Sequence, residues 1–344
     1  MQRSLTSWLA RGLVVSGLVA IAALWVLVQP ISAPSPTPTP DPTSTPLPTP
    51  FPTFIPIPTW TSTPAPALTD LPAVISTVTP MSVPATGAIA TLEPSVATMG
   101  AVTLAGRIEQ HTYPSQVSGT TESYRIYLPP GYDQSDRRYP VLYLLHGWPY
   151  EAADWENLGA AQVADVGIVN GTLLPFIIVI PRGSEALYVN TSGGDYSFEG
   201  QLVRDLTPHI DATYRTWPAW EERAIGGISR GGVWALEIAF RNPGLFSVVG
   251  AHSPALSMNL APPVYDPFNL LGNPGVTSLR IYLDAGDADW TGPSTRSLHE
   301  TLDGRGITNQ FTVHTGGHDR AMWSANIAEY IAFYTAGWID SAGE

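Results

Sequence analysis

The segment Gly227-Ile-Ser229-Arg-Gly231 is the most informative stretch of this chain. It follows the short apolar run 224–225 and opens the apolar segment 232–240, so it lies where a strand should turn sharply into a helix. A Gly-x-Ser-x-Gly sequence in that context is typical of a strained turn that presents a nucleophilic serine. The two glycines remove side chains that would clash where strand and helix close up. The serine then stands at a helix N-terminus, where the dipole favours developing negative charge, so Ser229 is the candidate nucleophile.

A candidate general base follows much later in the chain. Residues 310–314 predict a strand, and the loop after it reads Thr315-Gly-Gly-His318-Asp. A histidine on a loop after a strand is well placed to reach a serine at the edge of the same sheet. The alternative is a surface-loop histidine, since the chain has seven histidines. The order and the loop context favour His318 as the base.

Three carboxylates compete for the role of the triad acid. Residues 279–283 predict a buried strand that runs into Asp284-Ala-Gly-Asp287-Ala-Asp289. The expected chain order is serine, acid, histidine, and all three aspartates satisfy it. Two of them must have another role, as a turn former, a solvated loop charge or a helix cap. The residues alone leave the choice open.

An upstream loop predicts an oxyanion hole. Residues 140–145 form a buried-strand pattern that ends in His146-Gly-Trp148-Pro. In such a site one backbone N–H comes from the residue after the nucleophile, here Arg230, and the other from the loop after an early strand. Trp148 is the candidate for the second donor, because the proline after it has no N–H. We expect His146, at the strand end, to be structural.

These pieces resemble the Putative esterase family of the α/β-hydrolase superfamily. That family contains esterase D, enterochelin-esterase-like proteins, feruloyl esterases and bacterial mycolyltransferases. The resemblance covers about residues 105–338 and is specific for the family, but not for a substrate. It rests on Tyr124-Arg-Ile-Tyr-Leu-Pro-Pro-Gly-Tyr132, Tyr139-Pro-Val-Leu-Tyr-Leu-Leu-His-Gly147, Asp154-Trp155, Leu206-Thr-Pro-His-Ile-Asp-Ala-Thr-Tyr214, Gly227-Ile-Ser-Arg-Gly-Gly232 and Gly316-Gly-His-Asp-Arg-Ala-Met-Trp323.

The resemblance implies an acid and shows one departure. In such proteins the acid sits in a Gly-x-x-Asp segment after the strand, and Gly286-Asp-Ala-Asp289 matches, which implies Asp289. The family usually carries Met after the nucleophile, whereas this chain has Arg230. The backbone N–H is unaffected, but a guanidinium at the cleft edge could alter substrate choice.

Strands alternate with helices along the rest of the chain, which predicts a mostly parallel sheet covered by helices on both faces. The resemblance implies that this sheet belongs to an α/β-hydrolase fold. Residues 198–214 fit a helix with apolar residues four apart, and Pro208 should kink it. The expected strands are 124–128, 141–145, 176–180, 223–228, 247–251, 279–283 and 310–314. The other expected helices are 232–242, 294–303 and 321–336.

The N-terminal third predicts export rather than a second folded domain. Arg3 and Arg11 precede an uncharged apolar run, 12–28, which is near the lower limit for spanning a bilayer with the N-terminus inside. We expect residues 1–33 to be a membrane anchor, or a signal peptide cleaved after Ala33, although Pro34 should hinder cleavage. Residues 34–100 then form a Pro/Thr-rich disordered linker and 101–344 the esterase domain. The catalytic domain is therefore expected outside the membrane, or secreted.

Composition excludes several classes of protein. The chain has no cysteine, which excludes thiol chemistry, disulfides and Cys-zinc sites. Its formal net charge of −13 argues against nucleic-acid binding. No phosphate loop occurs, and the histidines show no metal-ligand spacing, so neither a cofactor nor a metal is expected.

The sequence thus predicts a serine esterase that hydrolyses a carboxylic ester of an extracytoplasmic carbohydrate, siderophore or lipid. Ser229, His318 and Asp289 form the triad, and the Trp148 and Arg230 amides bind the oxyanion. The alternatives are an acyltransferase acting on envelope glycans or lipids, and a non-catalytic surface module that binds glycans. The oligomeric state is left open.

Overall fold

The computed structural model describes residues 103–149, 151–190 and 192–338. They form an eight-stranded sheet in the order β1-β2-β4-β3-β5-β6-β7-β8. β2 pairs antiparallel with β1 and β4, and all other neighbours are parallel, as expected for a mostly parallel sheet. The strands are β1 (Arg107–Pro114), β2 (Thr121–Leu128), β3 (Val141–Leu145), β4 (Ile177–Pro181), β5 (Arg223–Ile228), β6 (Val248–His252), β7 (Arg280–Gly286) and β8 (Asn309–His314).

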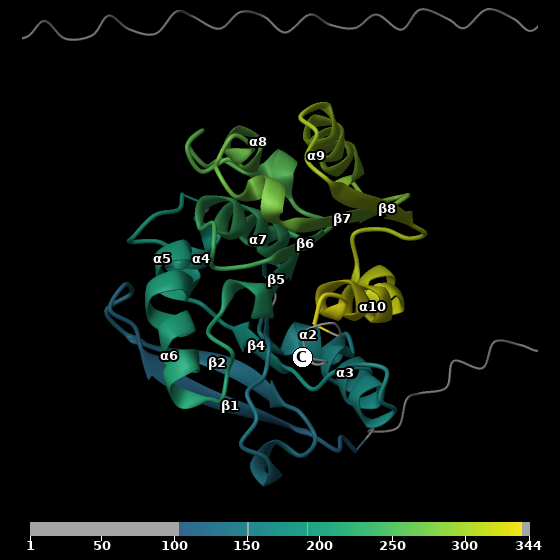
Figure 1. Cartoon of the computed structure of the whole chain (residues 1–344). Coiled ribbons are helices and arrows are strands. Elements are labelled where there is room, and N and C mark those ends of the chain that lie inside the picture. Colours follow the sequence, from purple (N-terminus) through teal and green to yellow (C-terminus); the bar gives the residue numbers. More distant parts are fainter. Residues whose placement is uncertain (1–102, 150, 191, 339–344) are drawn as a thin grey trace, which may run out of the picture. The chain divides into compact units, whose positions relative to one another are not determined.

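Helices cover both faces of the sheet (Figure 1). One buried cluster joins the sheet to α6, α7 and α9, and the other joins it to α2, α3 and α10. The helices are α2 (Ala153–Asn157), α3 (Ala160–Val169), α4 (Glu185–Val189), α5 (Phe198–Gly200), α6 (Thr207–Thr213), α7 (Arg230–Arg241), α8 (Pro267–Leu270), α9 (Gly292–Gly304) and α10 (Arg320–Thr335). This arrangement is the predicted α/β-hydrolase fold.

Several parts of the described chain differ from the sequence prediction. The helices α2, α3, α4 and α8 were not among the expected helices. The strand β1 was not expected, because all but one of its residues are exposed or only partly buried and show no clear apolar alternation. The helix expected over 198–214 is divided into α5, the π-helical segment η2 (Gln201–Leu206) and α6. Pro208 lies in the first turn of α6, so the expected kink takes the form of a change in helix type just before it.

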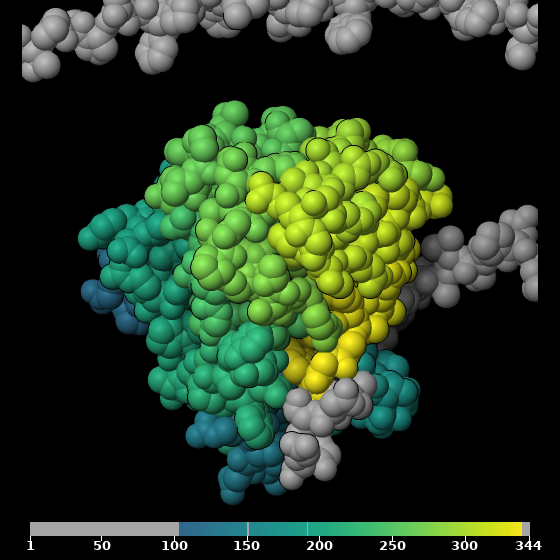
Figure 2. All heavy atoms as spheres, turned by 45° about the horizontal axis from the view of Figure 1, so that its top comes forward, coloured from purple at the N-terminus to yellow at the C-terminus, as the bar shows by residue number. Residues whose placement is uncertain are grey.

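The strand register brings the candidate residues to one edge of the sheet. Leu145 at the end of β3 pairs with Gly227, and Ile228 at the end of β5 pairs with His252. Because β3, β5, β6, β7 and β8 run parallel, the loops that follow them meet at their common carboxyl edge. Figure 2 shows the green segment that follows β6 next to the yellow-green helix α9 that follows β7.

The predicted anchor, residues 1–33, and the predicted linker, residues 34–100, lie outside the described residues. Within the described ranges, no helix has the length and apolar character that crossing a membrane requires. The boundary at residue 101 therefore stays a prediction.

Candidate active site

Ser229 occupies the strained turn between β5 and α7. Its backbone has φ 54° and ψ −117°, a region that is costly for a residue with a side chain. The turn is so tight that a Cβ at Gly227 would lie only 2.2 Å from the carbonyl group of Gly231. The Ser229 N–H donates to the His252 carbonyl at 2.9 Å, which ties the turn to β6. The side chain is therefore held at the start of α7 by its backbone.

The loop after β8 brings His318 to this serine. The His318 Nε2 atom lies 2.9 Å from Ser229 Oγ, and Nδ1 lies 3.0 and 3.1 Å from the two Asp289 carboxylate oxygens. The imidazole contacts the ring of Trp290 at a centroid distance of 4.8 Å and the ring of Trp323 edge-on at 5.1 Å. The three side chains that the sequence analysis selected are thus connected in series, with the ring held on two sides.

Asp289 is buried and receives several hydrogen bonds. Its Oδ1 atom accepts from the Thr291 backbone N–H and from the Thr291 hydroxyl, both at 2.8 Å. Burial would raise the pKa of Asp289, but hydrogen bonds from His318, Ser253 and Thr291 overcome that effect and lower the pKa to about 2. The carboxylate is therefore ionised at neutral pH and can accept a hydrogen bond from the Nδ1–H group of the imidazole.

The other two aspartates lie in different surroundings. The Asp287 carboxylate accepts the Gly316 N–H at 3.0 Å, so Asp287 shapes the loop that carries His318. The prediction that both unused aspartates are turn formers, solvated charges or caps is wrong for Asp284, which is fully buried. Asp284 lies within β7 as the register partner of His252 on β6, and its carboxylate also contacts Tyr330 of α10. It therefore faces buried side chains of β6 and α10 instead of solvent.

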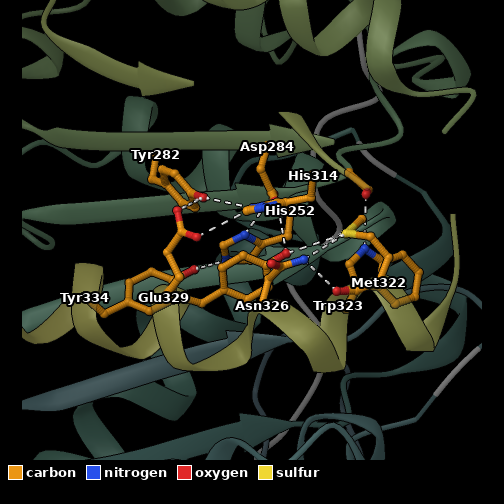
Figure 3. Close-up of polar contacts among 11 residues, drawn as sticks. His252, Tyr282, Asp284, His314, Met322, Trp323, Asn326, Glu329 and Tyr334 are labelled. Carbon is orange, nitrogen blue, oxygen red and sulfur yellow. Dashed lines mark hydrogen bonds and ion pairs between the residues drawn. The ribbon is translucent and has the colours of Figure 1, made fainter. Parts of the chain in front are cut away.

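Asp284 is the centre of a buried polar network formed by residues of β6, β7, β8 and α10 (Figure 3). Its carboxylate lies 2.9 Å from His252 Nδ1 and 3.3 Å from His314 Nε2, and it accepts the Tyr330 hydroxyl at 2.6 Å. The other ring nitrogen of His252 lies 2.7 Å from the Tyr334 hydroxyl. The network supports the end of β6, whose last residue accepts the Ser229 N–H. Sequence reasoning missed it, because His252 and Asp284 are 32 residues apart and lie on neighbouring strands.

The loop after β3 lies against the start of α7. A Cβ on Gly231 would meet the carbonyl oxygens of Leu145 and His146, so the two backbones are in close approach. Within the described chain neither the Trp148 nor the Arg230 amide donates a hydrogen bond. His146 is buried, and its ring nitrogens lie 2.8 Å from the carbonyl oxygens of Gly147 and Arg182, contacts that fit the predicted structural role.

A cavity of about 390 Å³ borders this loop. It is open at the surface and combines one exposed aromatic ring, that of Trp148, with several charged side chains. Its lining residues are His146, Trp148, Pro149, Glu151, Arg182, Gly183, Glu185 and Tyr188. Half-burial lowers the pKa of the neighbouring Arg230 guanidinium. The sequence analysis marked the loop after β3 but not the cavity, since the second wall comes from a separate segment, residues 182–188.

The geometry can support nucleophilic attack by a serine hydroxyl with a histidine base. No metal or cofactor is needed for that chemistry. In the part of the chain that the structure describes, no group of three or more His, Asp or Glu side chains is arranged to hold a metal ion.

Comparison with known proteins gives one family and several relatives. The sequence profile described as Putative esterase matches residues 115–334. An endo-1,4-β-xylanase/feruloyl esterase of Xylanibacter ruminicola is 35% identical over 153 residues, which are 42% of this chain and 21% of that protein. An esterase of Mycobacterium tuberculosis is 30% identical over 156 residues, which are 44% of this chain and 33% of that protein. The chain thus covers only a minor part of the length of these two relatives.

Solved structures share the fold. A ferulic acid esterase superimposes with a TM-score of 0.61 at 24% identity, covering 67% of this chain and 99% of that protein. The shared part therefore includes nearly the whole of the solved protein and about two thirds of this chain.

Proposed function

The chain belongs to the Putative esterase family, and from that premise we propose that it is a serine esterase that uses Ser229 as its nucleophile. The observation that carries the proposal is the position of the His318 ring, which bridges Ser229 Oγ at 2.9 Å and the Asp289 carboxylate at 3.0 Å. A purely structural role would not require a strained serine, a histidine that bridges it to an aspartate, and an ionised buried carboxylate on that aspartate.

Acylation would begin with attack of Ser229 Oγ on the ester carbonyl carbon, while His318 Nε2 takes the hydroxyl proton. Asp289 accepts a hydrogen bond from the Nδ1–H group and stays ionised, which fixes the tautomer and stabilises the imidazolium. The negative charge that develops on the carbonyl oxygen would be bound by the Trp148 and Arg230 N–H groups, each donor contributing roughly 3 kcal/mol. His318 then returns the proton to the departing alkoxide, which leaves an acyl-serine.

Deacylation would repeat these steps with water as the nucleophile. His318 removes a proton from water while the water oxygen attacks the acyl carbon. The bond between that carbon and Ser229 Oγ then breaks, His318 returns the proton to Oγ, and the carboxylic acid is released. If a sugar hydroxyl replaced water, the same steps would transfer the acyl group, so acyl transfer to envelope glycans or lipids is the second candidate reaction. A non-catalytic glycan-binding module is disfavoured by the connected Ser, His and Asp side chains.

The substrate and the setting are part of the proposal. A feruloyl ester is the first substrate to test, because a feruloyl esterase is among the relatives at 35% identity. The apolar run 12–28 with Arg3 and Arg11 before it supports a membrane anchor and an extracytoplasmic domain, with residues 34–100 as a linker and 101–344 as the catalytic unit.

A serine-directed label tests the assignment. The full-length protein is treated with a fluorophosphonate, and the modified residue is mapped by mass spectrometry. We expect the label on Ser229 and loss of both labelling and ester hydrolysis in Ser229→Ala. Ser324→Ala is the matched control, because that hydroxyl donates to the Leu158 carbonyl on the outer side of α10. A label on another serine, or an active Ser229→Ala protein, would refute the proposal.

A substrate panel then separates the two reactions. Acetyl, feruloyl and longer-chain esters are each supplied with and without a sugar acceptor, and free acid and acylated sugar are quantified. Free acid as the main product in both conditions supports hydrolysis. Acylated sugar as the main product would instead identify an acyltransferase.

A further inference from the structure

Ser253, directly after β6, has an unusual backbone conformation. It is fully buried and has φ 49°; among the described residues other than glycine, only Ser229 also has a positive φ. Such a conformation costs on the order of 1–3 kcal/mol and persists only where the surroundings enforce it. Because Ile228 and His252 are register partners, the two strained serines follow neighbouring strands at the same level of the sheet.

The contacts of Ser253 show where its hydroxyl is directed. The Trp323 indole N–H donates to Ser253 Oγ at 3.0 Å, and the Ser253 backbone N–H donates to the Asp284 carbonyl at 2.9 Å. A hydroxyl carries one hydrogen, so after accepting from the indole it has that hydrogen left to donate. The acceptor is the Asp289 carboxylate, where this hydrogen bond is one of those that hold the pKa low against the effect of burial.

We propose that Ser253 is a positioning residue that holds the Asp289 carboxylate toward His318, with the Trp323 indole fixing its hydroxyl. This inference rests on the proposed esterase function. The Thr291 donors come from the same loop as Asp289, two residues along the chain, so they move with it. Ser253 differs, because it belongs to the end of β6, next to the strand that carries the nucleophile. It therefore ties the acid to the sheet at the level of Ser229.

Trp323 has two roles in this arrangement. Its N–H fixes Ser253, and its ring lies edge-on against the His318 imidazole at a centroid distance of 5.1 Å. Helix α10 thereby supports both the acid and the base from one fully buried side chain. Trp323→Phe should keep the ring contact and remove only the donor.

Three variants separate the hydroxyl from the backbone. Ser253→Ala removes the hydroxyl and keeps the strain, whereas Ser253→Gly removes the hydroxyl and relieves the strain. Ser247→Ala is the matched control, since Ser247 precedes the same strand and its hydroxyl donates to the Glu221 carbonyl, away from the triad. We expect Ser253→Ala and Ser253→Gly to lower kcat about tenfold or more with KM changed less than about twofold, because a lost hydrogen bond to a charged group has that size. Ser247→Ala should keep the wild-type kcat.

The decisive readout is dependence on Asp289. If Ser253 acts through the carboxylate, Ser253→Ala should cost less than about twofold in an Asp289→Asn background. The NMR resonance of the His318 Nδ1 proton should also shift in both Ser253 variants and stay in place in Ser247→Ala. If Ser253→Ala proves too unstable to measure, Ser253→Gly gives the same comparison without the strained backbone.

The outcomes distinguish this inference from the proposed function. Wild-type kcat in Ser253→Gly, or an equal loss with and without the Asp289 carboxylate, would overturn the positioning role. Either result could stand while fluorophosphonate still labels Ser229 and Ser229→Ala is inactive, in which case the esterase assignment survives and only the role of Ser253 fails. A tenfold loss that disappears in the Asp289→Asn background supports the inference.

Discussion

Replacing Asp289 by asparagine should remove most of the activity through the tautomer of His318. Three donors converge on Asp289 Oδ1: the Thr291 N–H and hydroxyl at 2.8 Å and His318 Nδ1 at 3.0 Å. An asparagine would keep its carbonyl oxygen at that position, because Thr291 can only be satisfied by an acceptor. The amide NH₂ would then occupy the place of Oδ2, which lies 3.1 Å from His318 Nδ1.

This geometry sets the size of the effect. An NH₂ group facing Nδ1 stabilises the tautomer with the proton on Nε2, and that nitrogen can no longer accept the Ser229 proton. Loss of the base by such a tautomer change lowers kcat by roughly 10⁴-fold in a serine hydrolase, which corresponds to about 5.5 kcal/mol at the transition state. The fold should be preserved, because asparagine has almost the same shape.

The assay is steady-state hydrolysis of a small activated ester by the full-length protein. Asp287→Asn is the matched control, since its carboxylate accepts only the Gly316 N–H and does not contact His318 in the described structure. We expect Asp287→Asn to lose less than about tenfold in kcat. A loss below tenfold in Asp289→Asn, or an equal loss in Asp287→Asn, would refute the assignment of the acid.

Three further predictions concern stability. Folding lowers the pKa of Asp289 from 3.8 to about 2, which at about 1.4 kcal/mol for each pH unit stabilises the folded protein by about 2–3 kcal/mol. This stabilisation is present above about pH 4 and is lost as the pH falls toward 2. In urea denaturation the wild type should therefore lose its stability advantage over Asp289→Asn in that pH window. Gly231→Ala should cost more than about 3 kcal/mol or prevent folding, because its Cβ would overlap backbone oxygens, whereas Gly304→Ala meets no atom within 4 Å and should be neutral or up to about 1 kcal/mol more stable by thermal melting. Asp284→Asn should destabilise the protein by about 2–4 kcal/mol in chemical denaturation, because Tyr330 and His252 both depend on its charge; a loss below 0.5 kcal/mol would contradict the buried network.

Most of the sheet could be predicted from local pattern, and the exception is instructive. β3 and β5 are buried along their whole length, so they read as apolar or small-residue runs and their predicted bounds agree with the structure. β1 lies at the edge of the sheet and is mostly half-buried or exposed. Its side chains carry no apolar alternation, and only its pairing with β2 makes it a strand.

The strained turn at Ser229, the candidate nucleophile, was predictable because its sequence signal is local. A strained turn needs glycines at fixed offsets from the serine, and those offsets are visible in five consecutive residues around Ser229. His318 could be selected by chain order and by its loop context. The contact between His318 Nε2 and Ser229 Oγ could not be predicted, since 89 residues separate these two side chains, whose atoms lie 2.9 Å apart.

The residues alone left three aspartates as candidates and the resemblance implied Asp289, but only the tertiary structure shows which of them lies beside His318. Asp284 and Asp289 follow the same apolar run, but the register of β7 turns Asp284 inward against His252, and the turn after the strand carries Asp289 to the level of His318. Residue type and spacing do not specify that difference, because it depends on which strand lies beside β7. The contact between Ser253 and the Trp323 indole could not be predicted from the sequence, because it depends on how the end of β6 packs against α10. A hydrogen bond requires that two groups lie close together in space, whatever their separation along the chain.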